Sequence, residues 1–204
     1  MTRKHQNIVF PRLSGGHAER VIAALSMVIL LSVVSAHGQE MEVPVQVQFA
    51  LFEKIVSFNR ASNAQAEGDF RLGILYQPAV RASSQVAEEG LDVASRLLFN
   101  GRKVHVIAIP IAGMGDAEAA ITRTDVEALY VAPLRSPNIS AIARSSQRHK
   151  VLTLTGVPVY VEDGLSVGIA LKGSRPQVLI NVNASKAEGA DFSSQLLRIA
   201  KTIP

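Results

Sequence analysis

Cysteine is absent from all 204 residues of the chain. A disulfide framework and a cysteine-ligated metal site are therefore excluded. Histidine does not supply a metal site instead, because His105 and His149 are isolated and have no carboxylate pattern near them. The G-x-S-x-G turn that presents a catalytic serine is also missing. The sequence thus predicts no catalytic residue, no metal site and no cofactor, and we expect a protein that is not an enzyme.

A complete glycine-rich phosphate loop is missing as well. Gly113-Met114-Gly115 follows a predicted strand, as such a loop would, but Glu118 stands where the third glycine belongs. Pro110 also interrupts the approach to the loop. The segment is therefore interpreted as a plain connection between a strand and a helix.

The first 38 residues have the composition of a secretory signal peptide. The basic residues Arg3, Lys4, Arg12 and Arg20 come first, and the apolar run Val21–Val34 follows them. Small residues then stand in Ser35-Ala36-His37-Gly38. We expect cleavage between Gly38 and Gln39 and export to the periplasm, with cleavage after Ala36 as the alternative. An uncleaved membrane anchor is the other interpretation, although the apolar run is shorter than the ~20 residues of a typical membrane-spanning helix.

Removal of the leader changes the charge of the protein. The leader holds four of the 21 Lys and Arg residues and one of the 17 Asp and Glu residues, so residues 39–204 keep 17 against 16. The sequence pI of about 9.6 therefore comes largely from the leader. A net charge of about +1 does not indicate a nucleic-acid partner.

Strands and helices alternate along residues 39–204, which predicts a single α/β domain with a mainly parallel sheet. The predicted strands are Phe70–Tyr76, Val104–Ile109, Ala128–Ala132 and Val151–Leu154. The predicted helices are Val45–Val56, Val80–Phe99, which Asn100-Gly101 would stop, and Pro137–Arg148.

The C-terminal part is predicted to be an antiparallel hairpin and a closing helix. Apolar residues alternate in Ser166–Leu171 and again in Gln177–Val182, which is typical of half-buried strands. The closing helix would use the stripe Phe192, Leu196, Ile199 and Ile203, with Ser185 or Asp191 as its cap. The expected sheet thus has about six strands, with helices on both faces.

Several polar residues have structural interpretations. His105 is expected to be a part-buried imidazole within its strand, and Asp125 and Glu127 are expected at a solvated strand edge. Arg102-Lys103 and Arg148–Lys150 would form a basic patch if they met at one end of the sheet. A small-molecule site would lie at the carboxyl ends of the strands, near Gln77–Val80, Pro110–Gly115 and Pro133–Pro137.

Four segments together resemble the YfiR/HmsC-like periplasmic family over residues 43–203. They are FALFEKIVSF (49–58), LFNGRKVHVIAI (98–109), ALYVAP with HKVLTLTG (128–133 and 149–156), and QVLINVNASKAEGADFSSQLLRIAKTI (177–203). The most specific piece is Ser193-Ser194-x-Leu196-Leu197. Without cysteine, the thiol-based sensing of some members is not carried over.

The resemblance implies a secreted regulator. Its best-known members restrain a membrane-bound diguanylate cyclase through the periplasmic domain of that enzyme, and so lower cyclic-di-GMP and biofilm formation. Members are often dimeric, so a homodimer is a further expectation, whereas the partner-binding residues stay unknown. The alternatives are a periplasmic small-molecule-binding module and an accessory protein of an envelope system.

Overall fold

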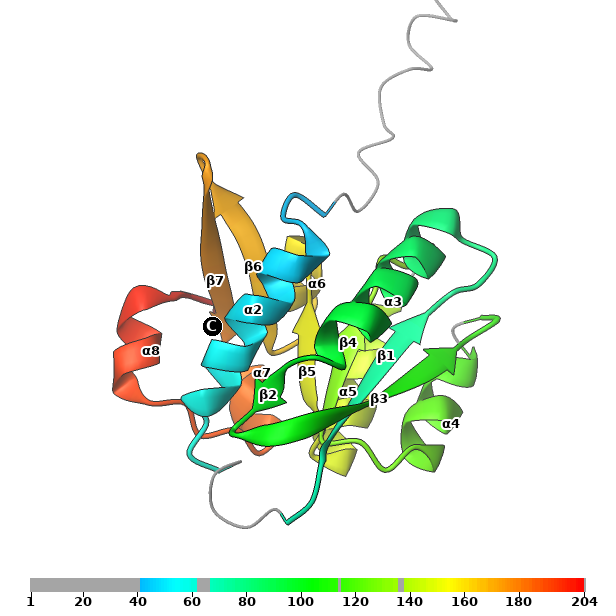
Figure 1. Ribbon diagram of the computed structural model, residues 1–204, viewed down its shortest axis with the longest axis horizontal. Coiled ribbons are helices and arrows are strands. Elements are labelled where there is room, and N and C mark those ends of the chain that lie inside the picture. Colours follow the sequence, from blue (N-terminus) through cyan, green and yellow to red (C-terminus); the bar gives the residue numbers. More distant parts are fainter. Residues whose placement is uncertain (1–40, 62–66, 114, 136–137, 204) are drawn as a thin grey trace, which may run out of the picture. The chain divides into compact units, whose positions relative to one another are not determined.

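An eight-stranded sheet runs through the computed structural model, which describes residues 41–61, 67–113, 115–135 and 138–203 (Figure 1). Its strands are β1 (Phe70–Tyr76), β2 (Leu98–Phe99), β3 (Arg102–Pro110), β4 (Ala128–Val131), β5 (Leu152–Thr155), β6 (Val167–Lys172), β7 (Arg175–Asn181) and β8 (Lys201–Ile203). Their order is β2-β3-β1-β4-β5-β6-β7-β8. The predicted leader, with its cleavage site at Gly38 and Gln39, lies outside the described residues.

The five central strands, from β3 to β6, are parallel, and the outer strands are not. β2 is antiparallel to β3, β7 is antiparallel to β6, and β8 is parallel to β7. The predicted α/β class with a mainly parallel sheet and a C-terminal hairpin is confirmed. The sheet has more strands than predicted because β2 and β8 each hold only two or three residues, too few to show a period of two.

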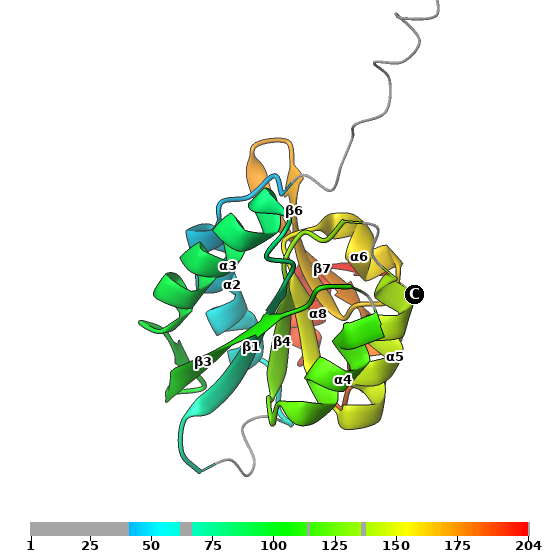
Figure 2. The same cartoon turned by 90° about the vertical axis from the view of Figure 1, so that its right-hand side faces the viewer.

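Helices cover both faces of the sheet, as predicted (Figure 2). One face carries α2 (Val45–Ser57) and α3 (Arg81–Ala94), and the other carries α4 (Gly115–Arg123), α5 (Ile139–His149) and α6 (Pro158–Glu162). Two short helices, α7 (Val182–Ala187) and α8 (Ser194–Ile199), follow the hairpin. None of the helices among the described residues is both long and apolar enough to cross a bilayer.

Each face of the sheet has its own hydrophobic core. On β4, for example, Tyr130 packs into the core under α2 and α3, while Leu129 and Val131 pack into the core under α4 and α5. A central parallel strand is buried on both faces, which explains its nearly continuous apolar sequence. The prediction for His105 is wrong, because this residue of β3 is exposed and not part-buried. β3 lies near the edge of the sheet, where the helices cover it only in part.

The predicted helix Val80–Phe99 is too long, because its last residues form a strand before β3. α3 ends at Ala94, and Leu98-Phe99 pairs with Arg102-Lys103 in a hairpin. Asn100 and Gly101 form its two-residue turn with φ angles of 53° and 76°. Positive φ at both turn positions matches the right-handed twist of the paired strands, and Asn-Gly favours it strongly. Asn100-Gly101 is thus a hairpin turn and not the end of a helix.

The predicted closing helix is also wrong, because the C-terminal segment forms two short helices and a strand instead of one helix. α7 ends at Ala187, Gly189 follows with a φ of +88°, and α8 contains only six residues before the chain extends into β8. Neither Ser185 nor Asp191 is a cap: Asn181 caps α7 and Ser193 caps α8. Phe192 and Leu196 are buried as expected, whereas Ile199 is 70% exposed. Ile203 pairs with Asn181 along β7, so backbone pairing at the sheet edge replaces the last helical turn.

Candidate functional site

The carboxyl ends of the parallel strands define the first candidate site. The chain leaves β1 for β3 on one side and later enters β4 on the other side of β1, so the strand order reverses between β1 and β4. Open α/β sheets bind ligands outside the strand ends at such a switch point. Two of the segments named from the sequence meet here, since the Arg135 N–H donates to the Gln77 side chain (2.6 Å). Ile111, from the third segment, donates its N–H to the carbonyl of Tyr76 at the end of β1 (2.9 Å).

Gln77 fastens the loops at this switch point to each other. Its backbone N–H donates to Ser83 Oγ of α3 (2.9 Å), and its side-chain oxygen accepts from the backbone N–H of Arg135 (2.6 Å). The neighbouring Leu134 N–H donates to the hydroxyl of Tyr160 (2.9 Å). Burial raises the pKa of Tyr160 to about 12, against the effect of that hydrogen bond, so the hydroxyl stays neutral. The Arg135 residue itself is exposed beside this edge.

A second polar cluster is entirely structural. Gln48 of α2 is fully buried, and its amide nitrogen donates to the carbonyl of Val43 (2.6 Å) while its oxygen accepts from the Tyr130 hydroxyl (2.9 Å). Gly156 packs directly against this amide, and a methyl group there would overlap it. Burial raises the pKa of Tyr130 far above its usual value. The cluster ties the segment before α2 to the centre of the sheet.

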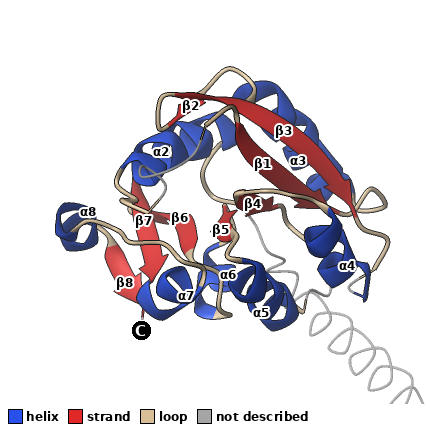
Figure 3. Cartoon of the chain, turned by 90° about the horizontal axis from the view of Figure 1, so that it is seen from below, coloured by secondary structure: helices blue, strands red, loops and turns tan. Residues whose placement is uncertain are grey.

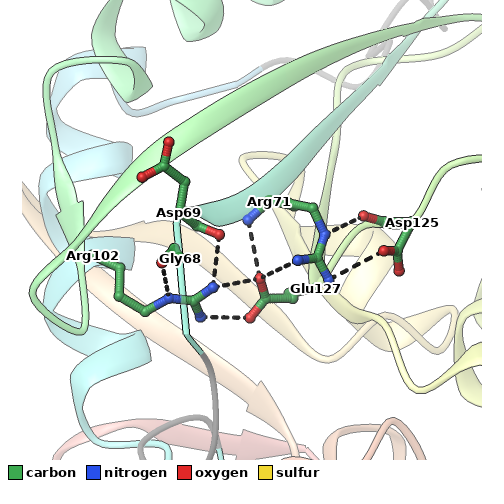
Figure 4. A network of polar contacts seen from close by, with 6 residues as sticks. All are labelled: Gly68, Asp69, Arg71, Arg102, Asp125 and Glu127. Carbon is green, nitrogen blue, oxygen red and sulfur yellow. Dashed lines mark hydrogen bonds and ion pairs between the residues drawn. The ribbon is translucent and has the colours of Figure 1, made fainter.

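The amino end of the sheet carries a network of charged groups (Figure 4). Arg102 binds both carboxylate oxygens of Glu127 (2.7 and 2.9 Å) and also donates to the carbonyls of Gly68 (2.8 Å) and Asp69 (2.7 Å). Arg71 contacts the same carboxylate through its backbone N–H (3.1 Å). Partial burial would raise the pKa of Glu127, but the hydrogen bonds from Arg102 and Arg71 hold it below its usual value.

This network corrects the interpretation of Glu127, which is a half-buried ion-pair partner and not a solvated edge residue. Asp125 is exposed, as expected, beside Arg71. Two cations of the predicted basic patch are ion-paired, Arg102 with Glu127 and Arg148 with Glu118. Lys150 Nζ donates to the carbonyl of Ala187 (2.7 Å).

A buried carboxyl group was not visible in the sequence. Glu188 is 2% exposed and accepts hydrogen bonds from the N–H (2.8 Å) and hydroxyl (2.8 Å) of Thr153 and from the Ser166 hydroxyl. Burial raises the pKa of Glu188 to about 7, although these three hydrogen bonds favour the charged form. In the sequence Glu188 lies in a polar stretch, Lys186–Asp191, that is typical of a solvated loop. The group fastens the end of α7 to β5 and to Ser166, which directly precedes β6.

The specific serine–leucine motif is a cap and an anchor. Ser193 Oγ accepts from the Leu196 N–H (3.4 Å) and so caps α8. Leu196 is buried in the core under α2, Leu197 packs beside it, and Ser194 is exposed. The motif therefore holds the closing segment in place and contributes no reactive group. Among residues 41–61, 67–113, 115–135 and 138–203, no three His, Asp or Glu side chains are placed to hold a metal ion.

The fold and these sites define a class: an α/β domain with parallel central strands and polar clusters that fasten its loops and ends. The chain belongs to the YfiR/HmsC-like family, whose sequence profile matches residues 45–201. The resemblance drawn from the sequence is thereby confirmed. No curated protein sequence matches the chain.

Solved structures with the same fold are distant in sequence. An ABC domain from Streptococcus pneumonia in complex with L-Trp has a TM-score of 0.60 at 15% identity, covering 78% of this chain and 62% of its own. A conserved domain protein from Vibrio cholerae has a TM-score of 0.59 at 14% identity, covering 78% of this chain and 60% of its own. The ligand-free, open form of a substrate binding protein with adhesive properties from Clostridium difficile has a TM-score of 0.55 at 15% identity, covering 79% of this chain and 60% of its own. The chain thus spans about three-fifths of each, and the likeness shows the fold alone.

Proposed function

We propose that the protein is a periplasmic regulatory binding protein that restrains a membrane-bound diguanylate cyclase and so lowers cyclic-di-GMP. The observation that supports this most is family membership over residues 45–201, which spans nearly the whole α/β domain. The polar side chains Gln48, Arg102 and Glu188 all hold parts of the fold together through hydrogen bonds, which agrees with a binding role. Binding would then use the surface.

The mechanism we propose is a population shift. The protein would bind the periplasmic domain of the cyclase more tightly in the inactive state than in the active state, because equal affinity for both states shifts nothing. When the active fraction is small, a tenfold fall in it needs about 1.4 kcal/mol of net bias. A rigid binding domain can supply that bias without any chemical step.

The test is deletion of the gene in its host, with cyclic-di-GMP and surface attachment as readouts. Deletion should raise both, and complementation with the full chain should restore them. Complementation without residues 1–38 is the matched control, because the protein would then stay in the cytoplasm and should not restore either. If neither readout changes under conditions where the protein is expressed, the proposed function is wrong.

A small-molecule-binding module is the second candidate. The switch point between β1 and β4 favours it, since the loops there are already fastened by Gln77. A ligand present at a hundred times its dissociation constant would stabilise the folded protein by about 2.7 kcal/mol. Thermal unfolding against amino acids, nucleotides and sugars would detect such a ligand, and Gln77→Ala should weaken its effect. A flat response across all three classes would remove this candidate.

A further inference from the structure

Charge is distributed unevenly along the chain. Residues 164–203 contain five Lys and Arg residues and two carboxylates, whereas residues 41–163 contain twelve and thirteen. Of the two carboxylates, Glu188 is buried and Asp191 pairs with Arg60 (2.7 Å). None of the five cations forms an ion pair with a described residue: Lys172, Arg175, Lys186, Arg198 and Lys201. All five are exposed, so the part of the fold from β6 onward carries an excess of exposed positive charge. The carboxylates nearest to it come from earlier segments: Glu42 accepts from the Leu171 N–H of β6 (3.1 Å), and Glu162 and Asp163 are exposed at the end of α6.

Strand register places three of these cations on one face of the sheet. Lys172 pairs with Arg175 across the hairpin, and paired residues point to the same side. Lys201 of β8 is level with Leu179 of β7, which shares the side of Arg175 because the two are four residues apart. Lys172, Arg175 and Lys201 therefore lie on one face, which we call the basic hairpin face.

The helices identify which face this is. Asn181 has the same orientation as Arg175, and its side chain binds the Val161 carbonyl of α6 (3.2 Å) and caps α7. The basic hairpin face is thus on the side of α5, α6 and α7, opposite α2 (Figure 3). Lys186 of α7 adds a fourth exposed cation on this side. The hairpin tip extends beyond the helices, so Lys172 and Arg175 are open to a partner (Figure 1).

The strand spacing fits a protein surface or segment with several carboxylates. Arg175 and the level of Lys201 are four residues apart along β7, about 13 Å at the usual rise per residue. A standard protein–protein interface spans more than this distance, so one partner surface can contact all three cations. Pairing of a partner strand along this edge is restricted, because β8 covers Leu179–Asn181 and Pro176 has no N–H to donate. Side-chain charge is the remaining means of recognition here.

We propose that the basic hairpin face binds an acidic surface on the periplasmic domain of the partner. This inference rests on the proposed function and adds the binding surface and the chemistry of the partner. Exposed charges at the rim of an interface mainly raise the association rate and make it depend on salt. Binding should therefore be fast at low salt and slow at high salt.

The experiment uses the exported protein purified from the envelope and each membrane diguanylate cyclase of its host, immobilised in detergent. Association rates are measured at low and high salt. For the cyclase that binds, the triple variant Lys172→Glu, Arg175→Glu, Lys201→Glu should lower the low-salt association rate by about tenfold or more and remove most of its salt dependence. The matched control is Lys54→Glu, Arg81→Glu, Arg123→Glu, which reverses three exposed cations elsewhere and should change the rate less than twofold.

The outcomes separate this inference from the proposed function. If a cyclase binds and the triple variant associates as fast as the wild type, the surface assignment is wrong and the function stands. If no cyclase binds and deletion leaves cyclic-di-GMP unchanged, both fail. Binding of the wild type to phosphatidylglycerol vesicles, lost in the triple variant while cyclase binding is kept, would assign the face to a membrane and overturn the inference. Exchange of the partner's acidic residues for lysine should restore association of the triple variant.

Discussion

At the scale of single residues, Glu188 couples the stability of the fold to pH. Its pKa is raised by burial from 4.5 to about 7, so the folded protein holds the proton more tightly than the unfolded chain does. The stabilisation from protonation is complete below pH 4.5 and is lost as the pH rises through 7. Relative to Glu188→Gln, the wild type should lose about 2 to 3 kcal/mol of unfolding free energy between pH 5 and pH 8.

Urea denaturation of both proteins across this pH range measures the difference. Two charged side chains are near Glu188: Lys150, which bonds the Ala187 carbonyl, and Lys186, which is two positions earlier in the sequence. The glutamine variant retains both, so the comparison isolates the titration of Glu188. A difference between the two proteins that does not vary with pH would show that the carboxyl group is not buried as described.

Arg102 is the second residue with a large expected effect. Its side chain is 12% exposed, and its guanidinium donates to the Glu127 carboxylate and to the carbonyls of Gly68 and Asp69. A lysine cannot span these acceptors, so Arg102→Lys should cost about 1 to 3 kcal/mol of unfolding free energy. Arg96→Lys is the matched control: it alters the exposed pair with Asp92 and should cost less than about 0.5 kcal/mol. Equal denaturation midpoints for the two variants would contradict the proposal that Arg102 joins Glu127 to the Gly68–Asp69 backbone.

At the scale of elements, the closing segment can be tested with two residues three positions apart. Leu196 is 2% exposed in the core under α2, and Ile199 is 70% exposed on the same short helix. Leu196→Ala should cost about 2 to 5 kcal/mol, whereas Ile199→Ala should cost less than about 0.5 kcal/mol. Denaturation midpoints measure both. A large loss for Ile199→Ala would support the continuous helix that the sequence pattern predicts.

The hairpin between β2 and β3 tests backbone conformation without packing. A methyl group at Gly101 would contact nothing within 4 Å, but φ there is +76°. Gly101→Ala should therefore cost about 1 to 2 kcal/mol through the left-handed conformation alone. Gly113→Ala is the control, since its surroundings are equally open and its φ does not lie in the left-handed range. Similar midpoints for the two variants would rule out the two-residue turn.

Both corrected elements show how local pattern and tertiary context compete. Phe192, Leu196, Ile199 and Ile203 have helical spacing, yet the uncovered edge of β7 takes the last of them into a strand. The central strands behave differently. β1 was predicted at its observed bounds, because burial on both faces selects an apolar run that is bordered by polar residues.

At the scale of the whole molecule, export is the prediction that precedes all others. The charged, apolar and small-residue order of residues 1–38 predicts removal of the leader. N-terminal sequencing of the envelope fraction should find Gln39 or His37 first. An intact Met1 terminus in the membrane fraction would support the anchor instead. The concentration of exposed cations toward β6–β8 belongs to this scale too, because in our proposal it decides the side from which an acidic partner approaches.

The sequence by itself determined the α/β class, the order of the central elements and the family. Those properties follow from periodicity and from motifs a few residues long, which are local. The tertiary structure alone decided the environment of Glu188, the pairing of Arg102 with Glu127 and the alignment of Lys201 with the hairpin cations. Each of these joins residues 22 or more positions apart, and no local pattern records such contacts. Their energies depend on burial and on the distance to a partner, which only the folded chain defines.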